Sequence, residues 1–167
     1  MSVEFKDIRT AQERFAGVIQ PSPLVRSSCL SRLLGSEVLL KLENLQETGS
    51  FKVRGAYNRL LHLSPEEQGK GVIAASAGNH AQGVAWAATR LGIQATIVMP
   101  EDVSIRKLLA VKEYGAEVIL FGKQFGEAYT HAEALAGPAG KTMIPAFADP
   151  HVISGQGTVG LEIMEAL

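Results

Sequence analysis

Residues 47–56 read Glu47-Thr48-Gly49-Ser50-Phe51-Lys52-Val53-Arg54-Gly55-Ala56, and the rest of the chain is organised around this stretch. A Gly-Ser turn precedes an aromatic residue and a lysine, and the apolar residues that follow recur at the spacing of an α-helix. These apolar residues are Val53, Ala56, Tyr57, Leu60 and Leu61. The pattern places the amine of Lys52 at the junction of a loop and a helix.

Lys52 is the first candidate for a chemical role. Backbone N–H groups at a helix N-terminus carry partial positive charge, which disfavours an ammonium ion and favours the neutral amine. A neutral amine is the form that attacks an aldehyde, so Lys52 is a candidate nucleophile. A lone lysine is usually a solvated surface residue, and motifs elsewhere in the chain decide between these two interpretations.

Two further motifs follow along the chain. One is Ser76-Ala77-Gly78-Asn79-His80-Ala81-Gln82-Gly83, and the other is Gly155-Gln156-Gly157-Thr158 followed by Gly160-Leu161-Glu162-Ile163. Together with residues 43–56 they resemble, in the same order, the lysine segment, the asparagine loop and a later segment of the threonine/serine dehydratases. These dehydratases are pyridoxal-phosphate enzymes of fold type II, the tryptophan synthase beta-like class. The resemblance implies an α/β fold with a parallel sheet and helices on both faces, a three-layer αβα arrangement.

Composition excludes several other classes of protein. The chain has 167 residues, of which 46% are hydrophobic and 20% charged, and this is ordinary for a globular domain. Acidic and basic residues are interspersed and the net charge is −1, so we expect neither a nucleic-acid nor a membrane partner. Cys29 is the only cysteine, which suits a reducing compartment, and the N-terminus lacks a targeting pattern. We therefore expect a cytoplasmic protein.

The order of the predicted elements indicates a parallel sheet. Three continuously apolar runs, at 72–75, 95–99 and 117–121, alternate with helical patterns at 80–91, 105–114 and 124–136. Another strand is expected near 142–144, and a last helix from Ser154 to Leu167. Before the lysine loop we expect a helix from Ile8 to Ile19, a short helix that Ser27 or Ser28 caps, and a strand at 37–42. Ser64-Pro65-Glu66-Glu67 reads as a capping box.

The resemblance also predicts the domain organisation. Residues 1–45 would belong to an incomplete large domain, residues 46–151 to a small αβα domain, and residues 152–167 to the start of a large-domain helix. The last helix reaches the final residue without a stop signal, so we expect a fragment whose first and last segments expose apolar surface. Family members carry a glycine-rich phosphate loop in a second half, and this sequence has no run of four glycines. We therefore expect the chain alone to be essentially inactive.

Roles for individual residues follow from the resemblance. Lys52 would carry pyridoxal phosphate and remove the α-proton of an amino-acid substrate as general base. Loss of the β-hydroxyl group would give a 2-oxo acid and ammonia. The implied activity is that of a threonine ammonia-lyase, with serine as a second substrate, in a homo-oligomeric parent protein. Asn79 would donate a hydrogen bond to the phenolic oxygen of the cofactor, and Phe51 would either lie near the ring or fill the core.

The substrate carboxylate would be received by backbone N–H groups where a loop enters a helix, since free amides and a positive helix end make an anion site. The loop comprises Ser76, Ala77, Gly78, Asn79 and His80. Gln156 and Thr158 are expected to open the last helix and either to complete this pocket or to serve in N-capping or in packing. Asn79, taken by itself, is equally explained as a helix cap.

Other activities are weaker alternatives. Racemases of this fold carry a serine where Ala77 stands, and racemisation needs a proton donor on each face of the cofactor, so Ala77 favours dehydration. A non-catalytic truncated paralogue that acts as a binding module also stays open. No metal site is predicted, because His62, His131 and His151 lack metal-ligand spacing and are expected at the surface.

Three short motifs are rejected on their context. Gly155, Gly157 and Gly160 match a dinucleotide-binding pattern, but no strand leads directly into them. Gly140-Lys141-Thr142 matches only the end of a phosphate loop, and a helix precedes it. Ser104-Ile105-Arg106-Lys107 has the S-x-x-K spacing without its partner motifs.

Overall fold

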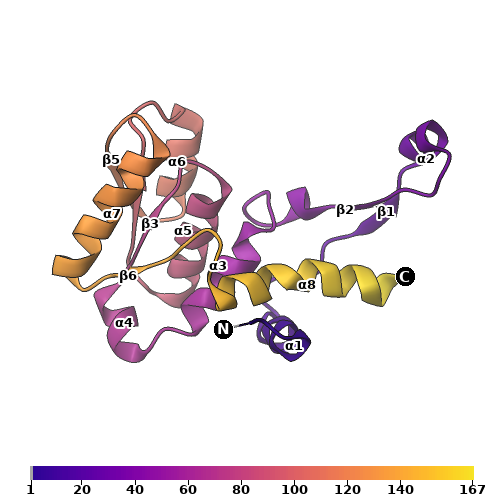
Figure 1. The fold of residues 1–167 in the computed structure, drawn as a ribbon, viewed down its shortest axis with the longest axis horizontal. Coiled ribbons are helices and arrows are strands. Elements are labelled where there is room, and N and C mark those ends of the chain that lie inside the picture. Colours follow the sequence, from indigo (N-terminus) through magenta and orange to yellow (C-terminus); the bar gives the residue numbers. More distant parts are fainter. Residues whose placement is uncertain (1) are drawn as a thin grey trace.

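A four-stranded parallel sheet forms the core of one end of the molecule in the computed structural model, which describes residues 2–167 (Figure 1). Its strands are β3 (Val72–Ala75), β4 (Ala95–Met99), β5 (Glu117–Leu120) and β6 (Thr142–Met143). They lie in the order β5-β4-β3-β6, and all three pairings are parallel. The parallel sheet expected from the apolar runs is therefore confirmed, with β6 ending one residue early.

Five helices accompany this sheet. They are α3 (Lys52–Leu61), α4 (Pro65–Lys70), α5 (Asn79–Leu91), α6 (Ile105–Glu113) and α7 (Phe125–Ala139). The capping box of α4 is present, since Ser64 Oγ accepts a bond from the Glu67 amide and the Glu67 carboxylate accepts one from the Ser64 amide. Ser104 stands at the N-cap of α6 but makes no side-chain cap bond. Gly92 ends α5 with a φ of 68°, in the left-handed region that glycine adopts without strain.

The strands divide the core into two layers of contacts, because successive side chains of a strand point to opposite faces. Val72 and Ala74 belong to a large core shared with α3 and α5. Ile73 and Ala75 belong to a second core, which includes Ala132 of α7. Helix α7 thus covers one face and α5 the other, so the predicted three-layer αβα arrangement is confirmed (Figure 1).

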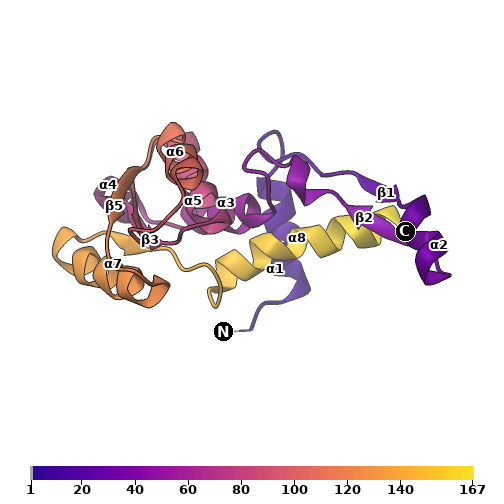
Figure 2. The same cartoon turned by 90° about the horizontal axis from the view of Figure 1, so that it is seen from above.

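The remaining elements extend away from the sheet. They are α1 (Phe5–Arg14), β1 (Leu24–Arg26), α2 (Ser28–Leu34), β2 (Leu39–Lys41), the 3-10 turn η1 (Glu43–Leu45) and α8 (Pro150–Ala166). Helix α8 packs against both α3 and α1, while the antiparallel ribbon of β1 and β2 carries α2 outward as an arm (Figures 1 and 2). The two-stranded ribbon is a feature that the sequence pattern did not predict.

Several helix boundaries differ from the expectation, and α7 runs to Ala139, three residues beyond its predicted end at 136. The first helix ends at Arg14, and a run of turns carries the chain on to Ile19, which is nevertheless buried. The last helix begins at Pro150, four residues before Ser154, because the Asp149 carboxylate accepts bonds from the first free amides of the helix, those of His151 and Val152. The predicted opening of this helix by Gln156 and Thr158 is therefore wrong.

Helices α3 and α8 cross at glycines. A Cβ atom added to Gly155 would lie 2.7 Å from the Arg54 carbonyl oxygen and 2.8 Å from the Gly55 Cα atom. A Cβ atom added to Gly55 would lie 2.8 Å from the Val152 carbonyl oxygen. The glycines of the rejected dinucleotide pattern therefore lie inside a helix, and Gly155 allows two helix backbones to touch.

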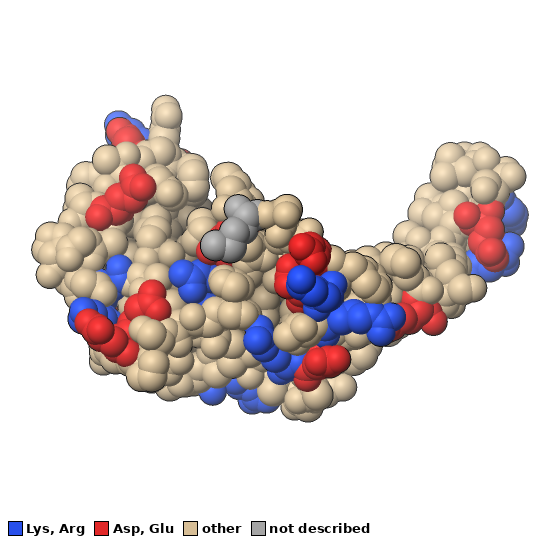
Figure 3. Space-filling view, turned by 60° about the horizontal axis from the view of Figure 1, so that its bottom comes forward, with Lys and Arg blue, Asp and Glu red and all other residues tan. Residues whose placement is uncertain are grey.

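Apolar side chains are exposed on the segments that were expected to show them. On the arm and at the end of α8 these are Val25, Leu30, Leu33, Leu34, Leu40, Met164 and Leu167. Charges of both signs are interspersed on the face shown in Figure 3. Within residues 2–167, none of the helices combines the length and the apolar character that a membrane crossing requires. The same residues hold no cluster of three metal-ligating side chains of the His, Cys, Asp or Glu type.

Candidate active site around Lys52

The sheet has a topological switch point between β3 and β6. The chain leaves β3 through α5 on one face, and it enters β6 from α7 on the opposite face. Crevices outside the carboxyl ends of such strands are the usual ligand sites of open parallel sheets. Residues 76–78 follow β3 and residues 144–149 follow β6, so both segments border this crevice.

The Lys52 amine points to this crevice. Lys52 is the first residue of α3, as predicted, and its Nζ atom donates a hydrogen bond of 2.8 Å to the carbonyl oxygen of Ala146. Its Nζ atom also lies 5.4 Å from the ring centroid of Phe51, which is 40% exposed. Burial lowers the pKa of the Lys52 amine, because a low-dielectric surrounding disfavours the charged form. The amine is therefore shifted toward the nucleophilic state.

The loop after β3 supplies fewer free amides than expected. The Ser76 amide donates to the Val98 carbonyl at 3.1 Å, and the Gly78 amide donates to Ser76 Oγ at 3.2 Å. Both amides have a partner within the chain, and the predicted role of Ser76 and Gly78 at the carboxylate stays a prediction. The amides of Asn79 and His80 lie in the first turn of α5, where amides have no partner inside the helix, and the Ala77 amide lies just before the N-cap Gly78. These three remain the candidate anion donors.

His80 is held neutral beside the lysine. Its side chain is 4% exposed, and its Nε2 atom must carry the proton, since it lies 3.0 Å from the Ile144 carbonyl oxygen, which can only accept. Burial, together with the positive charge of Lys52, lowers the pKa of His80 to about 4. Its Nδ1 atom is a buried acceptor with no partner among residues 2–167.

Asn79 and Gln156 do not occupy the helix-cap positions that their sequence context suggested. Gly78 is the N-cap of α5, so Asn79 is the first helical residue and its side chain is exposed instead of capping the helix. Gln156 lies in the second turn of α8, and its Oε1 atom accepts a bond of 3.2 Å from the Gly55 amide. Gln156 therefore ties α8 to α3, and its predicted contact with the carboxylate stays a prediction.

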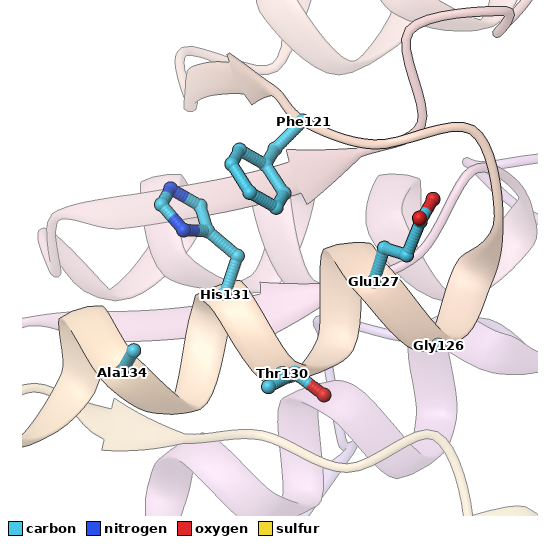
Figure 4. Close-up of a pocket in the computed structure, with 6 residues that line it drawn as sticks. All are labelled: Phe121, Gly126, Glu127, Thr130, His131 and Ala134. Carbon is cyan, nitrogen blue, oxygen red and sulfur yellow. The ribbon is translucent and has the colours of Figure 1, made fainter.

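Two cavities of similar volume adjoin the sheet, and one of them meets the site. A cavity of about 450 Å³ is lined by Ala75, by Phe125 and Tyr129 of α7, and by residues 143–148. Ala146, which accepts the Lys52 bond, is among its lining residues. The other, of about 440 Å³, lies over α7 and the end of β5, where the rings of Phe121 and His131 stack (Figure 4). None of the predicted site residues lines either cavity, and the first meets the site only through Ala146.

Comparison with known proteins assigns the family. Residues 16–167 match the family of pyridoxal-phosphate dependent enzymes. The chain belongs to this family. It is 53% identical over 165 residues to the L-threonine ammonia-lyase of Thermotoga maritima, an alignment that covers 99% of this chain and 41% of that protein.

Solved structures of the same family share the fold. The processed form of threonine deaminase isoform 2 from Solanum lycopersicum matches with a TM-score of 0.88 and 46% identity, over 98% of this chain and 49% of that one. Maize serine racemase matches with a TM-score of 0.95 and 34% identity, over 100% and 51%. The chain thus spans about half, or less, of the length of these relatives.

The residues around Lys52 fit the reactive end of the family's cofactor. Pyridoxal phosphate, when bound, supplies an aldehyde for a lysine amine and a ring that stabilises negative charge at the α-carbon of an amino acid. A partly buried amine with a lowered pKa suits the aldehyde. Ser50 Oγ and His80 Nδ1 are buried without partners among residues 2–167, and such atoms need a ligand or a water molecule to satisfy them.

Sequence reasoning missed a buried ionic network next to Lys52. The guanidinium of Arg54 is completely buried and bonds to the carboxylates of Glu43 and Glu162 and to Thr158 Oγ1. Lys41 bonds to Glu162 as well. The one available signal was Arg54, a second charged residue in the first turn of α3, where the residues other than Lys52 are small or apolar.

The three other histidines are not simple surface residues. His62 and His151 stack with their ring centroids 3.7 Å apart, and both are half-buried. His62 Nε2 lies 2.5 Å from Arg14 Nη1, so this nitrogen accepts and the ring connects α1 to α3. His131 is half-buried against Phe121. Their predicted surface location is therefore wrong in part, because aromatic stacking buries one side of each ring.

Proposed function

We propose that this chain supplies the lysine half of a pyridoxal-phosphate-dependent L-threonine ammonia-lyase. The reaction converts threonine to 2-oxobutanoate and ammonia, and serine is a second substrate. The observation that carries the proposal is the Lys52 amine, which has a lowered pKa and is fixed at the switch point beside the N-terminus of α5. Similarity to the L-threonine ammonia-lyase of Thermotoga maritima supports the choice of substrate.

The chain's own residues have separate tasks in this reaction. The free amides of Ala77, Asn79 and His80 orient the amino acid by its carboxylate, as helix N-termini do for anions. Lys52 leaves the Ala146 carbonyl and, as the neutral amine, accepts the α-proton. His80 stays uncharged at neutral pH, so it adds no cation that would compete with the amides for the carboxylate.

Two measurements test this proposal. The chain is mixed with pyridoxal phosphate, reduced with borohydride and mapped by peptide mass spectrometry, with Lys52→Ala and Lys141→Ala compared with the unmodified sequence. We expect capture on Lys52 that is lost only in Lys52→Ala. Equal labelling of all lysines would overturn the cofactor site. Release of 2-oxobutanoate from threonine is then followed with the chain alone and with the remaining part of a full-length relative added.

We propose that the chain alone turns over slowly, because the reacting groups need both ends of the cofactor to be held. A rate equal to that of a full-length relative would refute this. A racemase is the second candidate, since maize serine racemase has the same fold. Ala77 weighs against it, because a methyl group cannot donate a proton to the opposite face. Accumulation of D-allo-threonine from L-threonine, or of D-serine from L-serine, would favour the racemase, and capture of the cofactor without any turnover would favour a binding module.

A further inference from the structure

Arg54 makes every hydrogen bond that its guanidinium can donate. Its Nε and Nη2 atoms bond to the two oxygens of Glu43 at 2.9 and 2.8 Å. Its Nη1 and Nη2 atoms bond to the two oxygens of Glu162 at 2.5 and 2.9 Å, and Nη1 also bonds to Thr158 Oγ1 at 3.0 Å. The guanidinium has five N–H donors in a rigid fork, and all five are used.

The network is balanced in charge. Arg54 and Lys41 contribute two positive charges, and Glu43 and Glu162 contribute two negative ones. Lys41 Nζ lies 2.5 Å from Glu162 Oε2 and 2.6 Å from the Ser22 carbonyl oxygen. Burial alone would raise the pKa of Glu162, but the bonds from Arg54 and Lys41 outweigh it and lower that pKa. All four side chains are largely removed from water.

Arg54 and Lys52 lie in the same helix turn, so the ionic network constrains the residue that carries the amine. Residues two apart in an α-helix lie about 200° apart around the axis, so their side chains leave opposite sides of the first turn of α3. On one side, Arg54 is bound to Glu43 of η1, 11 residues before it, and to Glu162 of α8, 108 residues after it. On the other side, Lys52 reaches the Ala146 carbonyl. The bonds of Arg54 therefore fix the rotation of the first turn of α3, and this rotation sets the direction of the Lys52 side chain.

The backbone of Lys52 is also confined from the side of α5. A Cβ atom added to Gly83 would lie 3.0 Å from the Lys52 carbonyl carbon. Helix α5 therefore touches the main chain of Lys52 directly, while Gly55 and Gly155 bring α8 against the following residues of α3. Contacts with α5 and α8 limit the translation of the first turn of α3. Rotation of this turn about the helix axis is its main remaining motion, and the Arg54 bonds prevent that rotation.

We propose that Arg54, together with Glu43 and Glu162, is a positioning residue that holds the Lys52 amine at the Ala146 carbonyl beneath the switch point. The inference rests on the proposed role of Lys52 as the reactive amine. Arg54 is completely buried, so it acts through α3 and not by touching the substrate or the cofactor. The bidentate geometry is required, because a lysine in its place has one compact charge and cannot grip two carboxylates at once.

The test measures the Lys52 amine itself and needs neither cofactor nor turnover. The whole chain is acetylated with trace acetic anhydride at a series of pH values, and mass spectrometry follows the rate at each lysine. The variants are Arg54→Lys, the charge-neutral pair Arg54→Met with Glu162→Met, and Arg59→Lys as the matched control. Arg59 lies on the same helix and pairs with Asp149 at 3.0 Å, at the end far from Lys52.

We expect both Arg54 variants to raise the midpoint of Lys52 titration, so that its neutral fraction at pH 8 falls by about threefold or more. Arg59→Lys should leave that midpoint in place. Arg54→Lys leaves two buried carboxylates poorly matched and destabilises the chain, whereas the neutral pair removes one charge of each sign and leaves Lys41 and Glu43 with opposite charges. Cooperative unfolding in urea would show that the double variant is folded. If the folded double variant has the same midpoint of Lys52 titration as the unmodified chain, the proposal is overturned. Absence of cofactor capture would refute the proposed function alone, because acetylation would still report the position of Lys52.

Discussion

Alanine at position 155 should destabilise the protein relative to alanine at position 160, although both replace a glycine in the same helix. Glycine in a helix interior costs about 1 kcal/mol relative to alanine, so each substitution gains that amount from backbone propensity. At Gly160 nothing lies within 4 Å of the added Cβ atom, and the gain should appear in full. At Gly155 the added atom meets Arg54 and Gly55 backbone atoms at 2.7 and 2.8 Å, which cannot move aside cheaply.

Overpacking a close contact costs about 1–3 kcal/mol, and this cost is the expected difference in free energy of unfolding between the two variants. Gly157→Ala should fall between them, because its new neighbour at 2.8 Å is the flexible end of the Ile8 side chain. Urea unfolding followed by circular dichroism measures the difference, provided that the three chains share one m-value. In thermal unfolding the gap is about 2–12 °C. Equal stability of Gly155→Ala and Gly160→Ala would refute the close crossing of α3 and α8.

Three further predictions concern single interactions. The pKa of His80 is about 4 in the folded state, whereas its ordinary value is 6.5. The folded state therefore favours neutral His80, and this contribution to the free energy of unfolding is complete above pH 6.5 and is lost as the pH falls toward 4. The loss is about 3 kcal/mol, and His80→Gln should flatten this part of a urea-midpoint curve against pH. Ser64→Ala removes the bond to the Glu67 amide and should cost about 1 kcal/mol, measured by urea unfolding. Asp149→Ala should cost about 2 kcal/mol, because the cap of α8 and the ion pair with Arg59 are both lost. Asp149→Asn keeps the cap and should cost about half as much in the same assay.

Sequence patterns predicted the elements that are determined locally. The runs at 72–75 and 95–99 are fully buried from end to end, so their apolar character could be recognised without their partners. The helix start at Lys52 followed from the Gly49-Ser50 turn and the spacing of Val53 and later apolar residues. The strands β1 and β2 have only three residues each, and their pairing of Val25 with Leu40 depends on a contact that no local pattern contains.

The beginning of α8 was predicted four residues too late, at Ser154 instead of Pro150. The predicted helix already contained the glycines at positions 155, 157 and 160, although glycine is unfavourable in a helix by itself. Packing reverses this preference, because Gly155 lets α8 approach α3 more closely than any residue with a side chain could. The local start signal was nevertheless present, since Asp149-Pro150 is an N-cap residue followed by proline at the first helical position.

The candidate site combines contacts that span most of the chain. Lys52 and Ala146 are 94 residues apart, His80 and Ile144 are 64 apart, and Arg54 and Glu162 are 108 apart. No pattern in the sequence specifies such pairs, yet all three bonds form within this one chain. We expect selective capture of an aldehyde by Lys52 to require only this local arrangement. Turnover depends in addition on how firmly the far end of the cofactor is held. We therefore expect the two properties to separate, with capture selective for Lys52 in this chain and turnover slow until the remaining part of the family's fold is supplied.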